Sequence, residues 1–420
     1  MHHLTRNYVN REPFAMRLQC NAVLLCALIF FMFASLDGKA QNATGKMTKN
    51  GAFYAGNYPN LFKEMSYSQP DIDAKLINAY RDIFEGPSKV YFEVGDSMAY
   101  VSDIKNHDAR TEGLSYGMMI AAQLNKKEVF DRILRWCKMY HERPFEGYFA
   151  WSIDPQTVKN NSDGPASDGE LYFVTSLLFA ANRWGNNTGN SYYNDARYIL
   201  DNMWKKDGTG KVFNLINTAY KQISFVPAGD MYNWTNPSYH LPAFMEVWAM
   251  YAKDGHEAFY KACADSSRAF LHKACNANTG LNYDYTEFDG SPHDMRWIPD
   301  AFRYDSWRVP MNITMDYYWF GKDAAWQKEY AKRPQIFLKG RGIHTLEDQF
   351  NPDGTLPDSI LQAGGYKKLR HSIGFVATSA AASLITKDNE FIHELWNSKL
   401  EPYPDGYFDP YYDGLLYLFS

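Results

Sequence analysis

In the stretch PASDGELYFVTSLLFAANRW, residues 165–184, a short polar segment precedes a long apolar helix face. We call such a polar segment at the start of a helix a polar opening. Leu177 and Leu178 follow Val174 by three and four residues, which places all three on one face of an α-helix. Asp168 lies in the polar opening, directly in front of that face. The stretch therefore predicts a helix that packs against a core and begins beside a carboxylate.

The same arrangement recurs along the chain. The alternation of apolar and polar residues that is typical of strands is scarce, and Lys89–Val94 is the best candidate for a strand. The helical stretches come in pairs, and the intervals suit helical hairpins with their loops. A helix at about 71–84 and the run Tyr411–Phe419 supply a sixth pair. We predict an all-α fold in which six hairpins close as an inner ring inside an outer ring; an open solenoid fits the spacing equally well. The polar openings lie near Glu112, Asp168, Tyr239, Asp305 and His371.

The composition narrows the class of protein. The chain has 420 residues, of which 45% are hydrophobic and 22% charged, so disorder and collagen-like architecture are excluded. The net charge is −5 and no basic stripe stands out, so we expect no nucleic-acid partner. The 11 Trp, 31 Tyr and 27 Phe residues are unusually many. Most must pack in a core, but exposed ring faces suit stacking on sugars.

The N-terminus has the features of a secretory signal peptide over residues 1–40. Arginines precede an apolar run from Ala22 to Ala34, which is shorter than the roughly 20 residues that a membrane-spanning helix needs. Small residues before Gln41 suit cleavage there. We expect a secreted or periplasmic protein with no membrane association after signal removal. A lead-in over 41–58 and one catalytic domain over 59–420 would follow.

Three cysteines remain after residue 40, namely Cys137, Cys263 and Cys275. An odd number at irregular spacing is not a disulfide framework, so buried free thiols are favoured over a Cys263–Cys275 bridge. The chain has no CxxC, HExxH or EF-hand motif. We therefore expect no metal site and no cofactor.

Several polar openings carry groups suited to acid–base chemistry. Glu112 begins one helix and Asp168 begins another, although stabilisation of the helix start explains either residue alone. Arg308 follows Asp305 by three residues, which suits a structural ion pair and would also keep the carboxylate ionised, as a general base requires. Tyr239 lies between two prolines that stiffen its segment.

Four of these segments resemble glycoside hydrolase family 8. ASDGE at 166–170 is similar to the family signature, which normally has Asp where Glu170 stands. TEGLSYGMM at 111–119 resembles the segment of the general acid, and RYDSWRVP at 303–310 resembles that of the general base. NPSYHLPAF at 236–244 resembles the segment whose tyrosine helps to hold the attacking water.

The resemblance implies an (α/α)6 barrel and an inverting glycoside hydrolase. Glu112 would be the general acid, and Asp305, helped by Tyr239, would be the general base. Asp168 would hydrogen-bond the distorted sugar at the cleavage point, and Arg308 is counted with the substrate-binding residues. Separately, we predict that Trp151 and Trp234 stack on sugar rings.

Within the family, the segments most resemble enzymes that release xylose from the reducing end of β-1,4-xylo-oligosaccharides. In those enzymes a loop histidine blocks the cleft and contacts the anomeric hydroxyl; His371 is the first candidate here and His344 the second. The expected partner is therefore a xylo-oligosaccharide, bound by a monomer. An Asp base argues against the chitosanase branch, but an endo-β-1,4-xylanase or endoglucanase of the same family stays open.

Two more distant alternatives remain. Gly113–Gly117 matches the G-x-S-x-G motif of serine hydrolases around Ser115, and Asp305 and His371 follow in the usual order. The polar residues before the motif do not form the buried strand that it needs. A non-catalytic glycan-binding protein also fits the aromatic content, although it does not require Glu112, Asp168 and Asp305 together.

Overall fold

The computed structural model describes residues 52, 56–140, 147–161, 164–186, 191–206, 208–253, 255–295, 301–358, 369–402 and 408–420. The chain divides into Met1–Thr48 and a compact unit, Lys49–Ser420. The predicted signal peptide and most of the predicted lead-in lie outside the described residues. Everything below concerns the second unit.

An inner ring of helices forms the centre of this unit. Its helices are apolar on nearly every side and largely buried, as expected for helices enclosed by others. Within the described residues the ring consists of α5 (Thr111–Gln123), α7 (Ser167–Trp184), α9 (Pro242–Tyr251), α11 (Arg308–Trp319), α13 (Ile373–Ala381) and α16 (Tyr412–Phe419).

The outer helices are more amphipathic and bury one face against the inner ones. Each runs back along its inner partner to complete a hairpin. In the described part of the chain the outer ring consists of α6 (Lys127–Tyr140), α8 (Tyr192–Asn202), α10 (Glu257–Ala274), α12 (Ala324–Arg341), α15 (Asn389–Asn397) and α4 (Gln69–Phe84).

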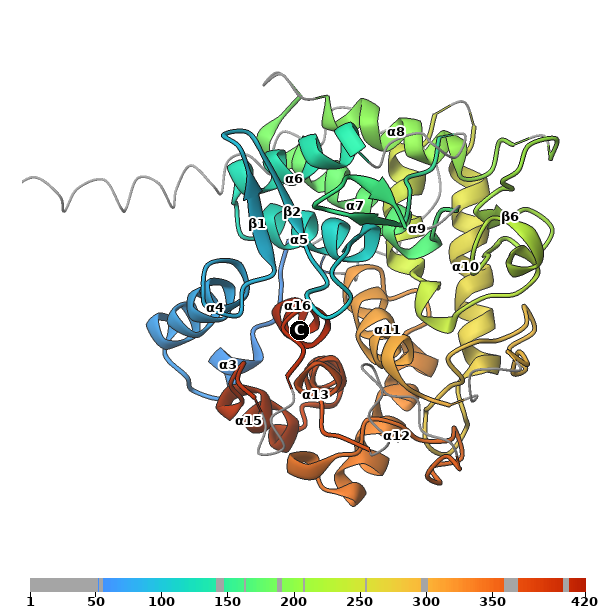
Figure 1. Ribbon diagram of the computed structural model, residues 1–420. Coiled ribbons are helices and arrows are strands. Elements are labelled where there is room, and N and C mark those ends of the chain that lie inside the picture. The colour runs from blue at the N-terminus through green and yellow to red at the C-terminus, as the bar shows by residue number, and fades with distance from the viewer. Residues whose placement is uncertain are drawn as a thin grey trace, which may run out of the picture. The chain divides into compact units, whose positions relative to one another are not determined.

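The inner ring is closed. Each inner helix packs against the next one along the chain, and α16 packs against both α13 and α5, so that the last helix meets the first (Figure 1). Helix α4 covers α16 and completes the sixth hairpin. The predicted fold, an (α/α)6 barrel, is confirmed, and the open solenoid is excluded because its two ends would not meet.

Short elements fill the loops. The predicted strand Lys89–Val94 is confirmed in part, since β1 pairs with β2 as an antiparallel hairpin. Among the residues that the structure describes, six other strands are short loop pairings that periodicity does not reveal. The strands are β1 (Tyr91–Val94), β2 (Met98–Val101), β3 (Ala109–Arg110), β4 (Ser152–Asp154), β5 (Lys159–Asn160), β6 (Ile216–Asn217) and β7 (Gln222–Ile223). The remaining helical turns are α3 (Leu61–Glu64), α14 (Ser383–Thr386), η2 (Gly229–Asn233), η3 (Pro237–Tyr239), η4 (Tyr304–Trp307) and η5 (Ile343–Thr345).

The starts of α5 and α7 approach each other closely. A Cβ atom on Gly169 would lie 2.4 Å from the Cβ atom of Thr111, so only glycine permits this contact. The contact brings together the first turns of two inner helices, which carry Glu112 and Asp168. Helix packing thus places two carboxyl groups at one end of the barrel.

The three cysteines are buried, as predicted, and Cys263 and Cys275 are free thiols that do not form the alternative bridge. Burial raises the pKa of Cys263 and of Cys275 to about 12. These thiols are therefore protonated and pack as small apolar groups. None of the described helices combines the length and the apolar character that crossing a bilayer demands.

Candidate active site

Three of the predicted carboxyl groups surround one guanidinium group. Arg308 Nη1 lies 3.3 Å from Glu112 Oε2 and 3.7 Å from Asp168 Oδ2, while Nη2 lies 2.9 Å from Asp305 Oδ1. Glu112 and Asp168 come from the first turns of α5 and α7, and Asp305 comes from η4, directly before α11. The structure thus gathers Glu112, Asp168, Asp305 and Arg308 at the N-terminal ends of the inner helices.

Arg308 lies within ion-pair distance of all three carboxyl groups, and its predicted role in substrate binding stays a prediction. Its side chain is 2% exposed. Its N–H groups donate to Glu112, the Asp305 backbone oxygen, Tyr116 Oη and Ser238 Oγ, in addition to the Asp305 carboxylate. A guanidinium has five N–H donors, and these five contacts occupy all of them.

Glu112 has the environment of a proton donor. Tyr411 Oη donates a hydrogen bond to Glu112 Oε1 at 3.1 Å, and Arg308 donates to Oε2. Burial, followed by the negative charge of Asp168, raises the pKa of Glu112 to about 8, although Arg308 opposes the rise. Glu112 is therefore protonated at neutral pH.

Asp305 has the environment of an anion. Its carboxylate pairs with Arg308 and accepts hydrogen bonds from Asn236 Nδ2 at 3.0 Å and from Tyr412 Oη at 3.4 Å. The preceding residue, Tyr304, has a left-handed backbone with φ of 35°, which is strained for a non-glycine residue. The turn thus holds Asp305 in an orientation that a regular helix start would not give.

A buried ion pair lies behind this turn. Arg303 Nε lies 3.2 Å from Asp284 Oδ2, and the two side chains are 0% and 3% exposed. Asn282 Nδ2 donates to Ser306 Oγ and ties the same loop to η4. The loop after α10 therefore braces the segment that presents Asp305.

Tyr239 lies near the carboxyl groups of Asp168 and Asp305. Its ring packs under the guanidinium of Arg308, with 5.7 Å from the guanidinium carbon to the ring centre, and the residue is 5% exposed. Burial, followed by the charges of Asp168 and Asp305, raises the pKa of Tyr239 well above its ordinary value. The hydroxyl therefore keeps its proton near both carboxylates.

Asp168 has the least exposed side chain of the three carboxyl residues. The backbone N–H of Gly169 donates to Asp168 Oδ1 at 2.9 Å. Burial raises the pKa of Asp168 above its ordinary value, while Arg308 opposes the rise. Asp168 thus lies close enough to Glu112 for its charge to raise the pKa of Glu112.

The two predicted stacking tryptophans differ in their surroundings. Trp151 is half-buried, and its ring lies 5.4 Å from the guanidinium carbon of Arg110, next to the start of α5. Trp234 is 4% exposed and stacks on Phe225 and His293, with ring centres 4.1 and 4.4 Å away. Other side chains of the protein thus already cover the ring of Trp234, which argues against its predicted stacking on a sugar.

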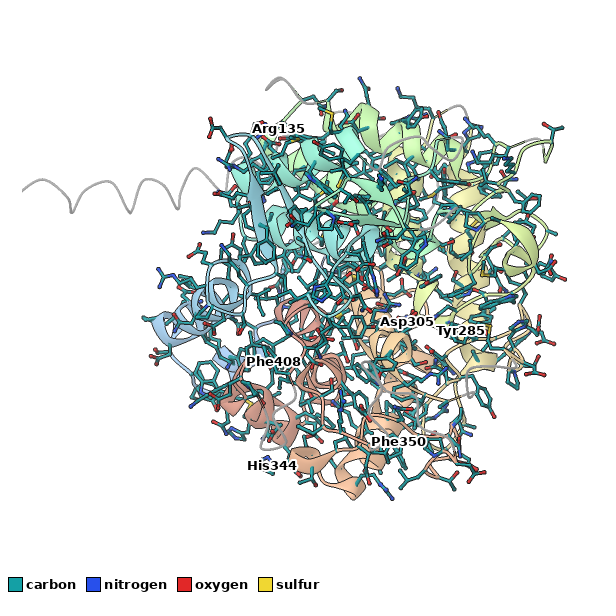
Figure 2. All side chains as sticks on the ribbon, viewed as in Figure 1. Arg135, Tyr285, Asp305, His344, Phe350 and Phe408 are labelled. Carbon is teal, nitrogen blue, oxygen red and sulfur yellow. The ribbon has the colours of Figure 1, made fainter. Side chains whose placement is uncertain are left out.

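Tyr285 is better placed than Trp234 for stacking on a sugar ring, because its ring is only half-buried. It packs edge-on against Trp234, and its half-buried ring lies close enough to Asp305 for that charge to contribute to the rise in the pKa of its hydroxyl, after burial and Asp284. Figure 2 labels Tyr285 beside Asp305.

The two candidate histidines also differ. His371 precedes α13, is half-buried, and its Nδ1 lies 3.1 Å from the Leu346 carbonyl oxygen. Burial lowers the pKa of His371 below its ordinary value, so the ring is neutral at neutral pH. His344 has a side chain that is 83% exposed and paired with Glu394, and it lies at the edge of the unit, away from Asp305 (Figure 2). The structure therefore keeps His371 as the better candidate.

The serine-hydrolase alternative does not fit the structure. Ser115 is fully buried inside α5, and its hydroxyl donates to the Glu112 backbone oxygen at 2.9 Å. A nucleophile elbow requires an exposed serine on a turn between a strand and a helix. Among the described residues no cluster of His, Cys, Asp or Glu side chains is suited to a metal ion.

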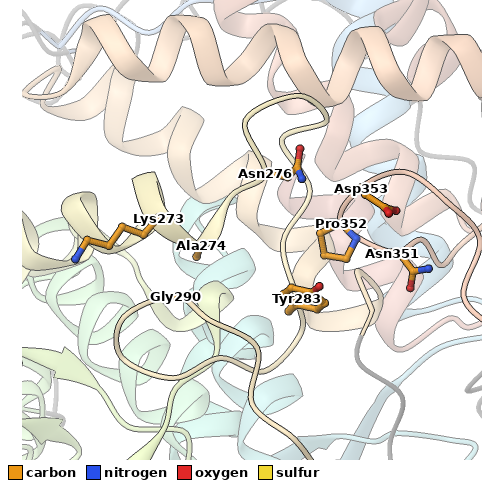
Figure 3. Close-up of a pocket in the computed structure, with 8 residues that line it drawn as sticks. All are labelled: Lys273, Ala274, Asn276, Tyr283, Gly290, Asn351, Pro352 and Asp353. Atoms are coloured by element: carbon orange, nitrogen blue, oxygen red, sulfur yellow. The ribbon is translucent and has the colours of Figure 1, made fainter.

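A pocket of about 410 Å³ lies elsewhere, between the loop after α10 and the loop around Asn351 (Figure 3). Two of its polar side chains stabilise the turns in which they lie. Asn276 Oδ1 accepts from the N–H groups of Asn278 and Thr279, and Asp353 Oδ1 accepts from Thr355. None of the residues that line this pocket belongs to the group of carboxyl residues around Arg308.

Three residues of the site are missed by the sequence pattern. Tyr411 contacts Glu112, and Tyr412 contacts Asp305. Asn236 also contacts Asp305. Asn236 lies inside the quoted segment 236–244, beside Tyr239. The signal for the tyrosines is their place at the opening of an inner helix, since the other openings also carry polar side chains.

Comparisons with known proteins agree with this site. The sequence profile of glycosyl hydrolases family 8 matches residues 100–355. A reducing end xylose-releasing exo-oligoxylanase of Halalkalibacterium halodurans is 37% identical over 386 residues, covering 89% of this chain and 95% of the relative. Rex8A of Paenibacillus barcinonensis, also named for that activity, is 34% identical over 90% of this chain and 97% of its own length.

A crystal structure of a reducing end xylose-releasing exo-oligoxylanase superimposes with a TM-score of 0.79 at 35% identity, covering 88% of this chain and 95% of that one. A more distant relative, endoglucanase 2 of Ruminiclostridium josui, is 28% identical over 70% of this chain and 58% of its own length.

Proposed function

This chain belongs to glycosyl hydrolases family 8, and from that premise we propose that it is an inverting hydrolase that releases xylose from the reducing end of β-1,4-xylo-oligosaccharides. The observation that carries the proposal is similarity to exo-oligoxylanases over nearly the whole length of both chains. The relative named as an endoglucanase is less similar and is covered over a smaller part of its length. The carboxyl groups gathered around Arg308 supply a proton donor and a proton acceptor for the reaction.

In the proposed reaction, protonated Glu112 gives its proton to the oxygen of the scissile bond. Asp305 takes a proton from a water molecule that attacks the anomeric carbon from the opposite face, which inverts the configuration. The hydroxyl of Tyr239 lies near Asp305 and helps to orient that water. Asp168 hydrogen-bonds the distorted sugar at the cleavage point, while Trp151 offers a ring face to a more distant sugar.

We further propose that His371 recognises the free reducing end. The Leu346 carbonyl can only accept a hydrogen bond, so Nδ1 of His371 carries the proton. In the neutral ring Nε2 is then an acceptor, which suits the hydroxyl on the anomeric carbon of the last xylose. Its position at the opening of an inner helix supports this role.

The proposed specificity predicts different fates for xylotriose and its borohydride-reduced alditol. We expect xylose and xylobiose from xylotriose and no cleavage of the alditol, because the alditol has no anomeric hydroxyl for His371 to bind. Product chromatography after parallel incubations checks this. Cleavage of both compounds, or rapid cleavage of long xylan alone, would instead mean endo action in an open cleft.

The pH dependence follows from the burial of Glu112. We expect kcat/KM on xylotriose to fall as the pH rises through about 8, because the pKa of Glu112 is raised to about 8 and only the protonated acid can transfer a proton. The pH profile of kcat/KM measures this directly. An alkaline limb near pH 4.5, the ordinary value for glutamate, would contradict it.

We also propose that the protein acts as a monomer outside the inner membrane, in the periplasm or the medium. The support is the basic N-terminus followed by the apolar run from Ala22 to Ala34. Mass spectrometry of the exported protein, with cleavage expected before Gln41, and light scattering test the two statements.

A further inference from the structure

Two consecutive tyrosines contact opposite members of the catalytic pair. Tyr411 Oη lies 3.1 Å from Glu112 Oε1, and Tyr412 Oη lies 3.4 Å from Asp305 Oδ1. Both tyrosines stand at the start of α16, the last helix of the chain. The acid and the base come from α5 and η4, so α16 is the one described element that contacts both through neighbouring residues.

A single carboxylate holds the backbone of both tyrosines. Asp409 Oδ1 accepts from the N–H of Tyr411 at 3.1 Å and from that of Tyr412 at 3.2 Å. Asp409 in turn pairs with Lys105, and its N–H donates to Asp413 Oδ2. The two hydroxyl groups are therefore presented from one anchored turn, and any movement of that turn moves both.

The ring of Tyr411 has no room to shift. A Cβ atom on Gly113 would lie 2.2 Å from the ring of Tyr411, so the ring packs directly on the backbone next to Glu112. Tyr411 itself is 2% exposed. Burial raises the pKa of both tyrosines well above the ordinary value, so each hydroxyl is a hydrogen-bond donor to its carboxyl group.

We infer that Tyr411 and Tyr412 are positioning residues that set the acid and the base separately, an inference that rests on the proposed function. When Glu112 loses its proton to the leaving oxygen, Tyr411 is already aimed at the carboxylate that forms, so the contact strengthens in the transition state. Tyr412 orients the Asp305 carboxylate before it takes a proton from water. Asp409 fixes the backbone of both tyrosines and so keeps the two contacts in a fixed relative position.

The test is a pair of phenylalanine variants read by pH profile. Tyr411→Phe is expected to lower kcat on xylotriose by about 10- to 100-fold, as for loss of a hydrogen bond to a charged group. The alkaline limb should move up by about one pH unit, because ionised Glu112 loses a donor. Tyr412→Phe should lower kcat less, since its contact is longer, and should leave the alkaline limb in place.

Tyr417→Phe is the matched control on the same helix. Tyr417 Oη donates to the backbone oxygens of Leu395 and Ser398, away from the carboxyl groups. We expect this variant to lower the melting temperature and leave both limbs in place. If Tyr411→Phe moves neither limb or both limbs, as a general loss of structure would, the inference is overturned.

A substrate-free readout separates this inference from the proposed function. Titration of Glu112 by NMR in protein labelled with ¹³C at the glutamate carboxyl should show a higher pKa in Tyr411→Phe than in the wild type. An unchanged titration would overturn the inference even in an active enzyme. A wild type that cleaves no xylo-oligosaccharide would overturn the proposed function, while the shifted titration would still support the contact.

Discussion

Replacing Glu112 with glutamine is expected to lower kcat on xylotriose by about 10²- to 10⁴-fold, the usual contribution of a general acid. Glutamine keeps the size of the side chain, and its carbonyl can still accept from Arg308, so the site should keep its shape. The amide cannot give a proton to the leaving oxygen. Steady-state kinetics of the purified variant measure the loss, and thermal unfolding checks that the fold is kept.

The choice of leaving group makes this test specific to the acid. Fluoride departs without being protonated, so β-xylobiosyl fluoride does not need Glu112. We expect the Glu112→Gln variant to hydrolyse this fluoride within about tenfold of the wild type, given that the acid contribution is absent from the reaction. An equal loss on xylotriose and on the fluoride would show that Glu112 acts in some other way.

Replacing Asp305 with asparagine is expected to lower kcat on both xylotriose and β-xylobiosyl fluoride by about 10²- to 10⁴-fold. Water must still be deprotonated with either substrate, and asparagine cannot accept the proton. The loss on the fluoride distinguishes a base from an acid. Substantial fluoride hydrolysis by Asp305→Asn would contradict the assignment of the base.

The stereochemistry of the wild-type product tests the same assignment independently. Attack by a water molecule activated by Asp305 inverts the β-linkage, so the first xylobiose formed should be the α-anomer. Proton NMR of a rapid reaction resolves the two anomers before they equilibrate. A β-anomer as the first product would mean a covalent intermediate and a different role for Asp305.

Much of the barrel follows from local pattern. The spacing of Val174, Leu177 and Leu178 indicates a helix whichever partner it packs against, because the period of a helix is a property of the backbone. The repeated polar openings indicate hairpins in the same way. Closure of the ring does not follow from these signals. An apolar face indicates that a helix is buried on that side, but it does not indicate which other helix packs against it.

The residues proposed to act in catalysis and binding were predictable to different degrees. Glu112, Asp168, Asp305 and Tyr239 lie in short segments whose order resembles a family, and the structure brings them together. Trp234 shows the limit of such reasoning. An aromatic side chain has the same chemistry in a cleft or in a core, and only its neighbours, Phe225 and His293, show that its ring is already covered.

Local sequence was thus sufficient for the helical class and the hairpin repeat, because these depend on spacing within a few residues. The segments proposed to carry the acid and the base were identified by their resemblance to a family. The role of Arg308 depended on the folded chain. Its nearest acidic neighbour in the sequence, Asp305, suggested one ion pair, yet it also holds Glu112, 196 residues away. The contacts of Tyr411 and Tyr412 arise in the same way, because only ring closure brings the last helix beside the first.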